Sequence, residues 1–280
     1  MIFYRHLLLI WLSLVGASVL ANPIPPLQLT PETCLSAINE AEKQHKNTRP
    51  KTINLLSWNI HKLKNPAAVG EIMAYSLESN ILFLQEAVEN KQLLAIKPFS
   101  SFAMGYQTQE FNSGVLTLSD YPMVVRCSYL HKEPWLRTPK ATKIILLDVD
   151  GTLLLTANIH SINFTLRTKI FEEQLSAIQK ILFAFDGPVV FGGDFNTWSE
   201  RRFKALTRIT NSANLMEVEF REGMRKQVFG SSLDRFFIRD IKIIKSRSRE
   251  TIASDHNPIF VTLELNPLCG RLCRTSGGGS

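Results

Sequence analysis

The stretch that decides the fold is Phe191-Gly192-Gly193-Asp194-Phe195-Asn196-Thr197-Trp198. Four apolar residues, Pro188–Phe191, predict a short buried strand, and the two glycines after it predict a tight turn. Asp194 and Asn196 follow that turn directly. Side chains at a strand end can be held rigidly at the rim of a sheet, and an Asp beside an Asn suits phosphate chemistry. The alternative is an ordinary turn in which Asp194 or Asn196 caps a helix that begins near Ser199.

The first 21 residues have the pattern of a secretory signal peptide. Arg5 and His6 precede an apolar run from Leu7 to Val15, and Val19-Leu20-Ala21 carries small residues at the −3 and −1 positions. We therefore expect cleavage after Ala21 and a secreted or periplasmic protein. The alternative is an uncleaved membrane anchor, although the run is shorter than the about 20 residues that span a bilayer.

The rest of the chain is expected to hold one large domain, at 51–266. An extension with a short helix precedes it at 22–50, and a tail with a cysteine pair follows at 267–280, ending in a Gly/Ser stretch typical of a flexible linker. One undivided domain is reasonable because α/β folds often reach about 200–250 residues.

The chain has four cysteines, and export would place them where they can pair. Cys269 and Cys273 lie close together in the tail, which leaves Cys34 and Cys127. Four cysteines allow three pairings, and the sequence does not choose among them. A zinc site would need a second pair of closely spaced Cys or His residues, which is absent from the sequence.

The net charge is +7, and much of the excess lies in the second half of the chain. Between Arg221 and Arg249 there are nine Lys or Arg residues against three acidic ones. This balance favours a polyanionic partner: nucleic acid, anionic phospholipid or cell-surface glycans. The alternative is the ordinary solvated surface of strands and loops.

The pattern along the chain mixes hairpins with strand–helix–strand units. A strand at 53–58, a helix at 67–77 and a strand at 81–84 make a crossover unit that places Asn59 and Glu86 at strand carboxyl ends. Asp150-Gly151 predicts the turn of a hairpin that ends at His160. The other expected elements are helices at 33–44, 166–185 and 199–210 and strands at 114–118, 123–130, 142–149, 152–159, 189–191, 233–238, 241–245 and 258–265.

A set of polar residues lies at the ends of these strands: Asn59, Glu86, His160, Asp194, Asn196, Asp234, Asp255 and His256. Each alone has an ordinary interpretation as a turn residue, an exposed strand end, a half-buried histidine or an Asp paired with a neighbouring cation. Their common placement at strand ends predicts a shared site.

The motifs that contain these residues resemble, in their order, those of the endonuclease/exonuclease/phosphatase superfamily, which includes deoxyribonuclease I, exonuclease III, neutral sphingomyelinases and inositol polyphosphate 5-phosphatases. The matching pieces are Ser57-Trp58-Asn59-Ile60, Leu84-Gln85-Glu86, Asn158-Ile159-His160, Gly193-Asp194-Phe195-Asn196, Ser232-Leu233-Asp234-Arg235 and Ser254-Asp255-His256-Asn257-Pro258. The resemblance runs from about Ile53 to Leu265. It implies an α/β fold, a four-layered sandwich of two packed mixed β-sheets flanked by helices, and with the signal-like start it suggests a secreted bacterial member.

The resemblance also implies phosphoester hydrolysis with a divalent metal. Glu86 would be the principal metal ligand, Asn59 would help to bind the metal or the phosphate, and Asp255 would lie near the metal. Asp194 would orient or deprotonate the attacking water, and Asn196 would donate to a phosphoryl oxygen. An oxygen ligand set suits Mg²⁺, or else Mn²⁺ or Ca²⁺, better than zinc.

Two histidines complete the implied site. His256, held by Asp234, would face the phosphate, and His160 would stabilise the developing charge or protonate the leaving oxygen. In deoxyribonuclease I the first histidine has a carboxylate partner. The counterpart of that carboxylate is not evident in this sequence. Glu110 only lies near the corresponding place in the order of the motifs.

The favoured function is a secreted, metal-dependent phosphodiesterase that acts as a DNA endonuclease. Arg137 and Lys140, in the stretch Trp135–Lys140, are candidate substrate contacts, although this stretch also fits a hydrophobic anchor in a surface loop. The alternatives are a phospholipid or inositol phosphate phosphoesterase, or a non-catalytic binding module, which is disfavoured because no site position is lost. A membrane-acting relative would carry an exposed apolar loop, and no obvious one stands out. We expect a monomer without a protein partner.

Overall fold

The computed structural model describes residues 30–44, 51–134, 138–165, 167–220 and 224–265. The expected signal peptide, Arg137, the tail cysteines and the Gly/Ser stretch lie outside the described residues. No helix in the described part of the chain is long and apolar enough to cross a bilayer.

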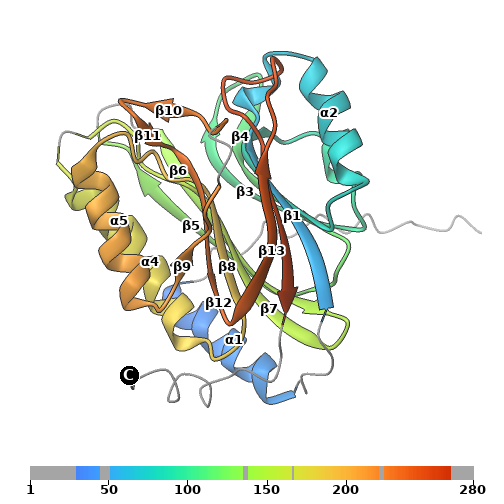
Figure 1. Cartoon of the computed structure of the whole chain (residues 1–280), viewed down its shortest axis with the longest axis vertical. Helices are drawn as coiled ribbons and strands as arrows, with labels where there is room; N and C mark the ends of the chain where they lie inside the picture. The colour runs from blue at the N-terminus through green and yellow to red at the C-terminus, as the bar shows by residue number, and fades with distance from the viewer. Residues whose placement is uncertain (1–29, 45–50, 135–137, 166, 221–223, 266–280) are drawn as a thin grey trace, which may run out of the picture.

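Two six-stranded sheets form the centre of the molecule (Figure 1). The first has the order β13-β14-β1-β2-β4-β3, and the second has the order β5-β6-β7-β8-β12-β9. The strands of the first sheet are β1 (Lys51–Asn59), β2 (Ile81–Val88), β3 (Phe99–Gln107), β4 (Asn112–Ser119), β13 (Ile241–Ser248) and β14 (Ile259–Leu265). Those of the second are β5 (Met123–Lys132), β6 (Pro139–Val149), β7 (Thr152–His160), β8 (Val189–Asp194), β9 (Met216–Glu217) and β12 (Asp234–Arg239), and a separate hairpin pairs β10 (Gln227–Val228) with β11 (Ser231–Ser232).

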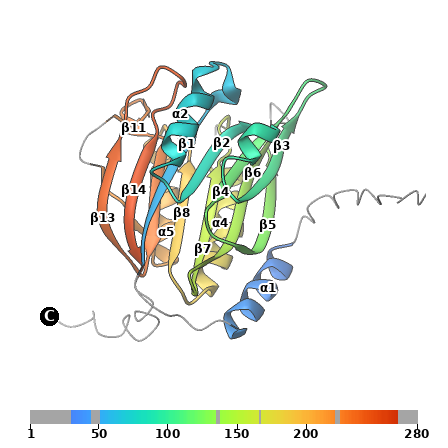
Figure 2. The same ribbon diagram turned by 90° about the vertical axis from the view of Figure 1, so that its right-hand side faces the viewer.

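The helices cover the outer faces of the two sheets. They are α1 (Pro31–Gln44), α2 (Ala67–Ser76), the short α3 (Lys91–Leu94), α4 (Lys169–Ala184) and α5 (Glu200–Ser212). Figures 1 and 2 show α2 on the outside of the first sheet, and α4 and α5 on the outside of the second. The layers are therefore helix, sheet, sheet and helix, which confirms the four-layered sandwich predicted from the sequence.

Central strands are apolar on both faces because both faces are covered. In the first sheet, Leu55 and Phe83 point into the layer between the sheets, where they join one core with Ile145 and Phe236 of the second sheet. Their neighbours, such as Trp58, point outward and pack with residues of α2. Burial of each large apolar side chain contributes roughly 1.5–3 kcal/mol, so these two-sided strands hold the sandwich together.

A disulfide joins Cys34 of α1 to Cys127 of β5. The sequence left the pairing of the cysteines open, and the structure shows this one. Cys34 and Cys127 are both fully buried, and α1 places Ile38 in the same core as the outward face of the second sheet.

The predicted strand–helix–strand units have the expected direction. β1 is parallel to β2, β7 is parallel to β8, and the turn Asp150-Gly151 joins β6 to β7 with positive φ at both residues. Strand β3, helix α3 and the two-residue strands β9 to β11 were not predicted, because short or edge segments carry little periodic signal. Ser199 caps α5 by accepting a hydrogen bond from the backbone amide of Arg202. Neither Asp194 nor Asn196 is therefore the N-cap of this helix.

Candidate active site

The carboxyl ends of the two parallel strand pairs meet at one end of the sandwich. There the chain encloses a cavity of about 510 Å³. Every residue of the predicted set lines this cavity except Asp234, which lies behind His256. The topology therefore brings together side chains that come from five separate motifs.

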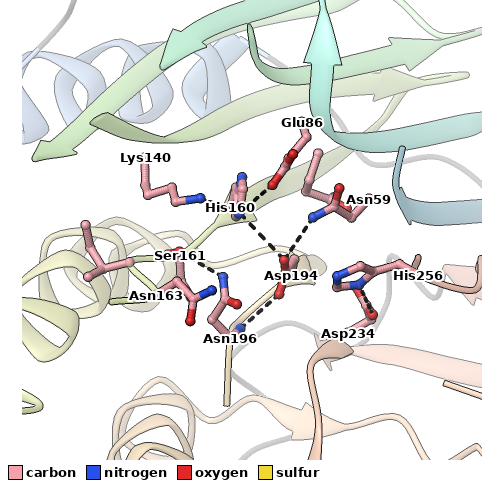
Figure 3. A network of polar contacts seen from close by, with 12 residues as sticks. Asn59, Glu86, Lys140, His160, Ser161, Asn163, Asp194, Asn196, Asp234 and His256 are labelled. Atoms are coloured by element: carbon pink, nitrogen blue, oxygen red, sulfur yellow. Dashed lines mark hydrogen bonds and ion pairs between the residues drawn. The ribbon is translucent and has the colours of Figure 1, made fainter. Parts of the chain in front are cut away.

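Asp194 lies at the centre of this group (Figure 3). Its Oδ2 accepts a hydrogen bond from Asn59 Nδ2 at 3.0 Å and lies 3.6 Å from His160 Nε2. Its Oδ1 accepts from the Asn196 amide at 3.0 Å. The side chain is only 2% exposed, so its position is fixed by these partners.

The two glycines before Asp194 are needed for close packing at this point. A Cβ on Gly193 would lie 2.1 Å from the Ile159 carbonyl oxygen, and φ at Gly193 is +138°. A Cβ on Gly192 would lie 2.4 Å from the Phe236 ring. Glycine is therefore required where β8 passes between β7 and β12, and this close approach sets Asp194 beside His160.

Glu86 does not follow β2 but lies within it, at a break in the pairing with β4, and has φ of +48°. This irregularity turns the carboxylate toward the cavity. Oε2 accepts a hydrogen bond from Lys62 at 2.5 Å, and Oε1 lies 3.9 Å from His160 Nε2. Burial by itself would raise the pKa of Glu86, but His160, Lys62 and Lys140 together lower that pKa to about 2. Glu86 is thus an ionised carboxylate at neutral pH.

Lys62 was not predicted as a site residue. It lies in the one-turn helix His61–Leu63 directly after β1, where three successive residues have positive φ. This left-handed turn is costly for residues other than glycine, and here it brings the Lys62 ammonium to Glu86. A lysine three positions after Asn59 carries no recognisable sequence signal.

His160 has a lysine as its nearest partner, whereas the first histidine of deoxyribonuclease I has a carboxylate whose counterpart was left open here. Lys140 Nζ lies 2.8 Å from His160 Nε2, and because an ammonium group can only donate, Nε2 accepts and the ring proton is on Nδ1. Burial and Lys140 lower the pKa of His160 to about 4, against the opposing effect of Asp194 and Glu86. The ring is neutral at pH 7 in this arrangement. Glu110 is exposed and makes no described contact with His160.

His256 has the partner that the sequence predicted. Its Nδ1 lies 2.8 Å from Asp234 Oδ2, and the indole of Trp58 donates to its carbonyl oxygen. Burial opposes a charge on this ring, but Asp234, with help from Asp194 and Asp255, raises the pKa of His256 to about 10. The two histidines of the cavity therefore differ in charge at neutral pH: His256 is cationic and His160 is neutral.

A hard divalent cation fits the donors that Glu86 and Asn59 present. Glu86 is an ionised carboxylate that already faces a cation, and Asn59 Oδ1 accepts from the His61 amide while keeping a second lone pair. Mg²⁺ is often held by one or two protein oxygens together with waters and substrate phosphates. In the described residues no group of three or more His, Cys, Asp and Glu is gathered as a complete metal cage. Asp255, the third predicted ligand, is half exposed and lies 3.4 Å from His61 Nδ1.

A buried arginine, Arg202, holds the two loops that carry the site, and the sequence analysis missed it. Its guanidinium donates to the carbonyl oxygens of Asn196 and Ile162 and to Thr165 Oγ1, and it lies 4.1 Å from the centre of the Phe171 ring. Arg202 is 2% exposed, although its place near the start of an amphipathic helix suggests a surface residue. Only the tertiary fold reveals this contact.

In the described part of the basic segment, residues 224–249, most of the arginines hold the fold. Arg235 pairs with Glu217, Arg247 and Arg249 both pair with Glu78, and Arg239 donates to backbone carbonyls. Lys226 of this segment lines the cavity, as do Lys62 and Lys140. Besides cationic His256, three lysines from separate parts of the described chain thus bring positive charge to the cavity.

An exposed apolar residue lies at the rim of the cavity, which the sequence analysis did not anticipate. Phe229 is 90% exposed at the turn between β10 and β11, and the neighbouring Val228 lines the cavity. In sequence this is a single phenylalanine in a polar stretch, so no apolar loop was evident.

Comparison with known proteins agrees with the family resemblance and with the fold. The model of the endonuclease/exonuclease/phosphatase family matches residues 56–256. A UPF0294 protein of Vibrio parahaemolyticus is 36% identical over 220 residues, which is 76% of this chain and 78% of that protein. A UPF0294 protein of Yersinia pseudotuberculosis is 33% identical over 218 residues, 76% of this chain and 84% of that protein.

Solved structures share the fold at low sequence identity. An endonuclease/exonuclease/phosphatase family protein of Leptotrichia buccalis has a TM-score of 0.59 at 16% identity, covering 76% of this chain and all of its own. Mannosyl-6-phosphatase of Bacteroides thetaiotaomicron has a TM-score of 0.56 at 13% identity, covering 75% of this chain and 99% of its own. Sphingomyelinase C of Streptomyces griseocarneus has a TM-score of 0.54 at 15% identity, covering 77% of this chain and all of its own. The chain belongs to the endonuclease/exonuclease/phosphatase family, whose members are in general hydrolytic phosphoesterases that typically use a divalent metal ion.

Proposed function

We propose that this protein is an exported phosphodiesterase that uses Mg²⁺ and cleaves DNA. The observation that carries the proposal is the arrangement around Asp194: a buried carboxylate between Asn59 and His160, in one cavity with ionised Glu86 and cationic His256. Hydrolysis of a phosphodiester needs a base for water, positive charge for the phosphoryl oxygens and side chains held rigidly in place, and this cavity offers all three.

Each residue has a role that its contacts support. Asp194 orients the attacking water and accepts its proton, because Oδ2 faces the cavity side occupied by His160. His256 donates from Nε2 to a phosphoryl oxygen, since Nδ1 is engaged by Asp234. Asn196 Nδ2 donates to the Ser161 carbonyl and keeps a second N–H for the phosphate. Glu86 and Asn59 would hold a divalent ion, which would supply Lewis acidity toward the phosphoryl oxygens.

His160 acts as a neutral partner of Lys140 in this proposal. Nε2 accepts from the Lys140 ammonium, so the pair together presents a proton and a positive charge on the leaving-group side. This differs from an acid role for His160 alone, because its lowered pKa keeps it unprotonated at neutral pH.

DNA is favoured as the substrate by Lys62, Lys140 and Lys226, which line the cavity and bring positive charge to a site for a polyanion. Export is supported by the signal-like start and by the Cys34–Cys127 disulfide, because such bonds persist in oxidising compartments. We expect a monomer.

A second candidate function is hydrolysis of a phospholipid headgroup. The exposed Phe229 at the cavity rim favours it, because an apolar tip beside a phosphodiesterase site can enter a lipid surface. A sphingomyelinase C is among the proteins that share the fold.

A substrate panel tests both candidates. The purified chain is incubated with supercoiled plasmid, RNA, sphingomyelin vesicles and phosphoinositide vesicles, each with Mg²⁺ or with EDTA. We expect nicking of the plasmid that depends on metal and weakens as salt is added, because phosphate contacts release counterions. Rapid lipid hydrolysis without nicking in the same buffer would replace the first candidate by the second.

A further inference from the structure

The loop after β7 forms a wall of the cavity that none of the family motifs includes. Asn163 and Phe164 of this loop both line the cavity. They lie three and four residues after His160 in the sequence, and Figure 3 shows Asn163 on the same side of the site as Asn196. Their side chains have no part in the hydrolytic roles described above.

The backbone of this loop is held by a buried carboxylate. Glu133, which is 1% exposed, accepts hydrogen bonds at Oε1 from the amides of Asn163 at 2.6 Å and Phe164 at 2.7 Å. Its Oε2 accepts from Thr138 Oγ1 at 3.1 Å. A buried carboxylate that accepts hydrogen bonds from two consecutive backbone amides fixes the backbone of both residues. It thereby fixes the point from which each side chain extends.

The orientation of the Asn163 amide is also determined. Trp198 Nε1 lies 3.0 Å from the side-chain oxygen of Asn163, and an indole nitrogen can only donate. The oxygen is therefore the atom bound to Trp198, and Nδ2 is the other end. No described residue accepts a hydrogen bond from Nδ2, and Figure 3 shows the Asn163 amide beside that of Asn196. The side chains of Asn163 and Asn196 thus both offer an amide donor to this cavity.

Phe164 offers an aromatic ring next to these donors. Its side chain is 53% exposed although its backbone is anchored by Glu133. An accessible ring on an anchored backbone, beside a phosphate-binding group, suits a planar partner attached to that phosphate. Nucleobases meet this description, because every base has a π-face and is joined to its phosphate through one sugar.

We propose that Asn163 and Phe164 form a nucleotide subsite, in which Asn163 Nδ2 donates to a phosphate oxygen and Phe164 stacks on the base attached to that phosphate. The subsite rests on the proposed function, since it requires a nucleic-acid substrate. It deepens that function by naming the group that is recognised next to the cleaved bond. This group is a base, bound by stacking on its ring face, so that any of the bases can be accepted.

The test compares variants on two oligodeoxynucleotides, one with ordinary bases and one with abasic sugars. Phe164→Leu should raise KM for the ordinary substrate about tenfold, within the range for one base stacked on a ring, and leave kcat nearly unchanged. It should leave KM for the abasic substrate near the wild-type value. Phe183→Leu is the matched control, because Phe183 is 52% exposed on α4 and does not line the cavity.

Two further variants keep the proposal falsifiable if Phe164→Leu folds poorly. Phe164→Trp retains a stacking face and should keep KM at or below the wild-type value. Asn163→Asp keeps the oxygen that binds Trp198 but replaces the donor by an anion, and should raise KM on both substrates. Binding of the ordinary oligonucleotide in EDTA, followed by fluorescence anisotropy, provides a readout that does not depend on turnover.

The outcomes separate the subsite from the function on which it rests. If wild-type protein cleaves DNA and Phe164→Leu behaves like Phe183→Leu on both substrates, the subsite is refuted and the nuclease function stands. If wild-type protein hydrolyses bis(p-nitrophenyl) phosphate but no oligonucleotide, the nuclease function itself is refuted. An increase in KM on lipid vesicles alone would assign Phe164 to a lipid surface and overturn the nucleotide assignment.

Discussion

Removal of the Cys34–Cys127 disulfide should lower the free energy of unfolding by about 2–4 kcal/mol. The bond closes a loop with a sequence separation of 93, for which chain entropy in the unfolded state gives about 4.6 kcal/mol as an upper value. Residual structure in the unfolded chain reduces this value, and the packing of Ile38 on the second sheet holds part of α1 in place without the bond.

The assay is urea unfolding followed by tryptophan fluorescence, with wild type compared to a variant carrying Cys34→Ala and Cys127→Ala. A second variant, Cys269→Ala with Cys273→Ala, is the matched control and should change the free energy of unfolding by less than about 0.5 kcal/mol. Reductant should bring wild type close to the first variant. The reasoning is refuted if the first variant matches wild type while the control variant or reductant causes the loss.

Further predictions follow from the other contacts. Glu86→Gln should lower the free energy of unfolding of the metal-free protein at pH 7, because it removes a carboxylate that binds Lys62; a more stable variant would show that negative charge is crowded there. Lys143 is 1% exposed without a described ion pair, and burial lowers its pKa from 10.5 to about 8. Its buried charge therefore lowers the free energy of unfolding by the full amount below pH 8, and this destabilisation disappears as the pH rises toward 10.5. Lys143→Met should thus raise the free energy of unfolding by about 1–3 kcal/mol at pH 7 but not at pH 10.5, measured by urea unfolding. Arg202→Met should lower kcat by about tenfold or more with a smaller change in KM, since two site loops lose their common donor. Mass spectrometry of exported protein should find a terminus after Ala21, and an intact Met1 would contradict signal cleavage.

The strand–helix order and the gathering of polar residues at strand ends could be predicted from local patterns, and the four layers followed from the family resemblance. Apolar runs that end in Asn59, Glu86 and Asp194 mark strands whose carboxyl ends meet once the crossover units are parallel. The pairing of Asp234 with His256 followed from the family resemblance, and the geometry agrees with it.

The contacts that escaped prediction are those between residues far apart in sequence. Arg202 reaches Ile162 across forty positions, and the pairing of Lys140 with His160 depends on the register of β6 and β7. Lys62 reaches Glu86 only because of an unusual left-handed turn. Composition was also a poor guide to the basic segment, where the buried Arg235 and Arg239 count as charge in the sequence but serve as internal hydrogen-bond donors.

The most direct test of the proposed chemistry is the initial rate of bis(p-nitrophenyl) phosphate hydrolysis by wild type and by Asp194→Asn at the same Mg²⁺ concentration. Asparagine keeps the size of the side chain but cannot take the proton of the attacking water, so the rate should fall by at least about a hundredfold. The urea-unfolding curves of the two proteins serve as the folding control. Wild-type activity should also disappear in EDTA. An Asp194→Asn variant that hydrolyses this ester at the wild-type rate would contradict the account.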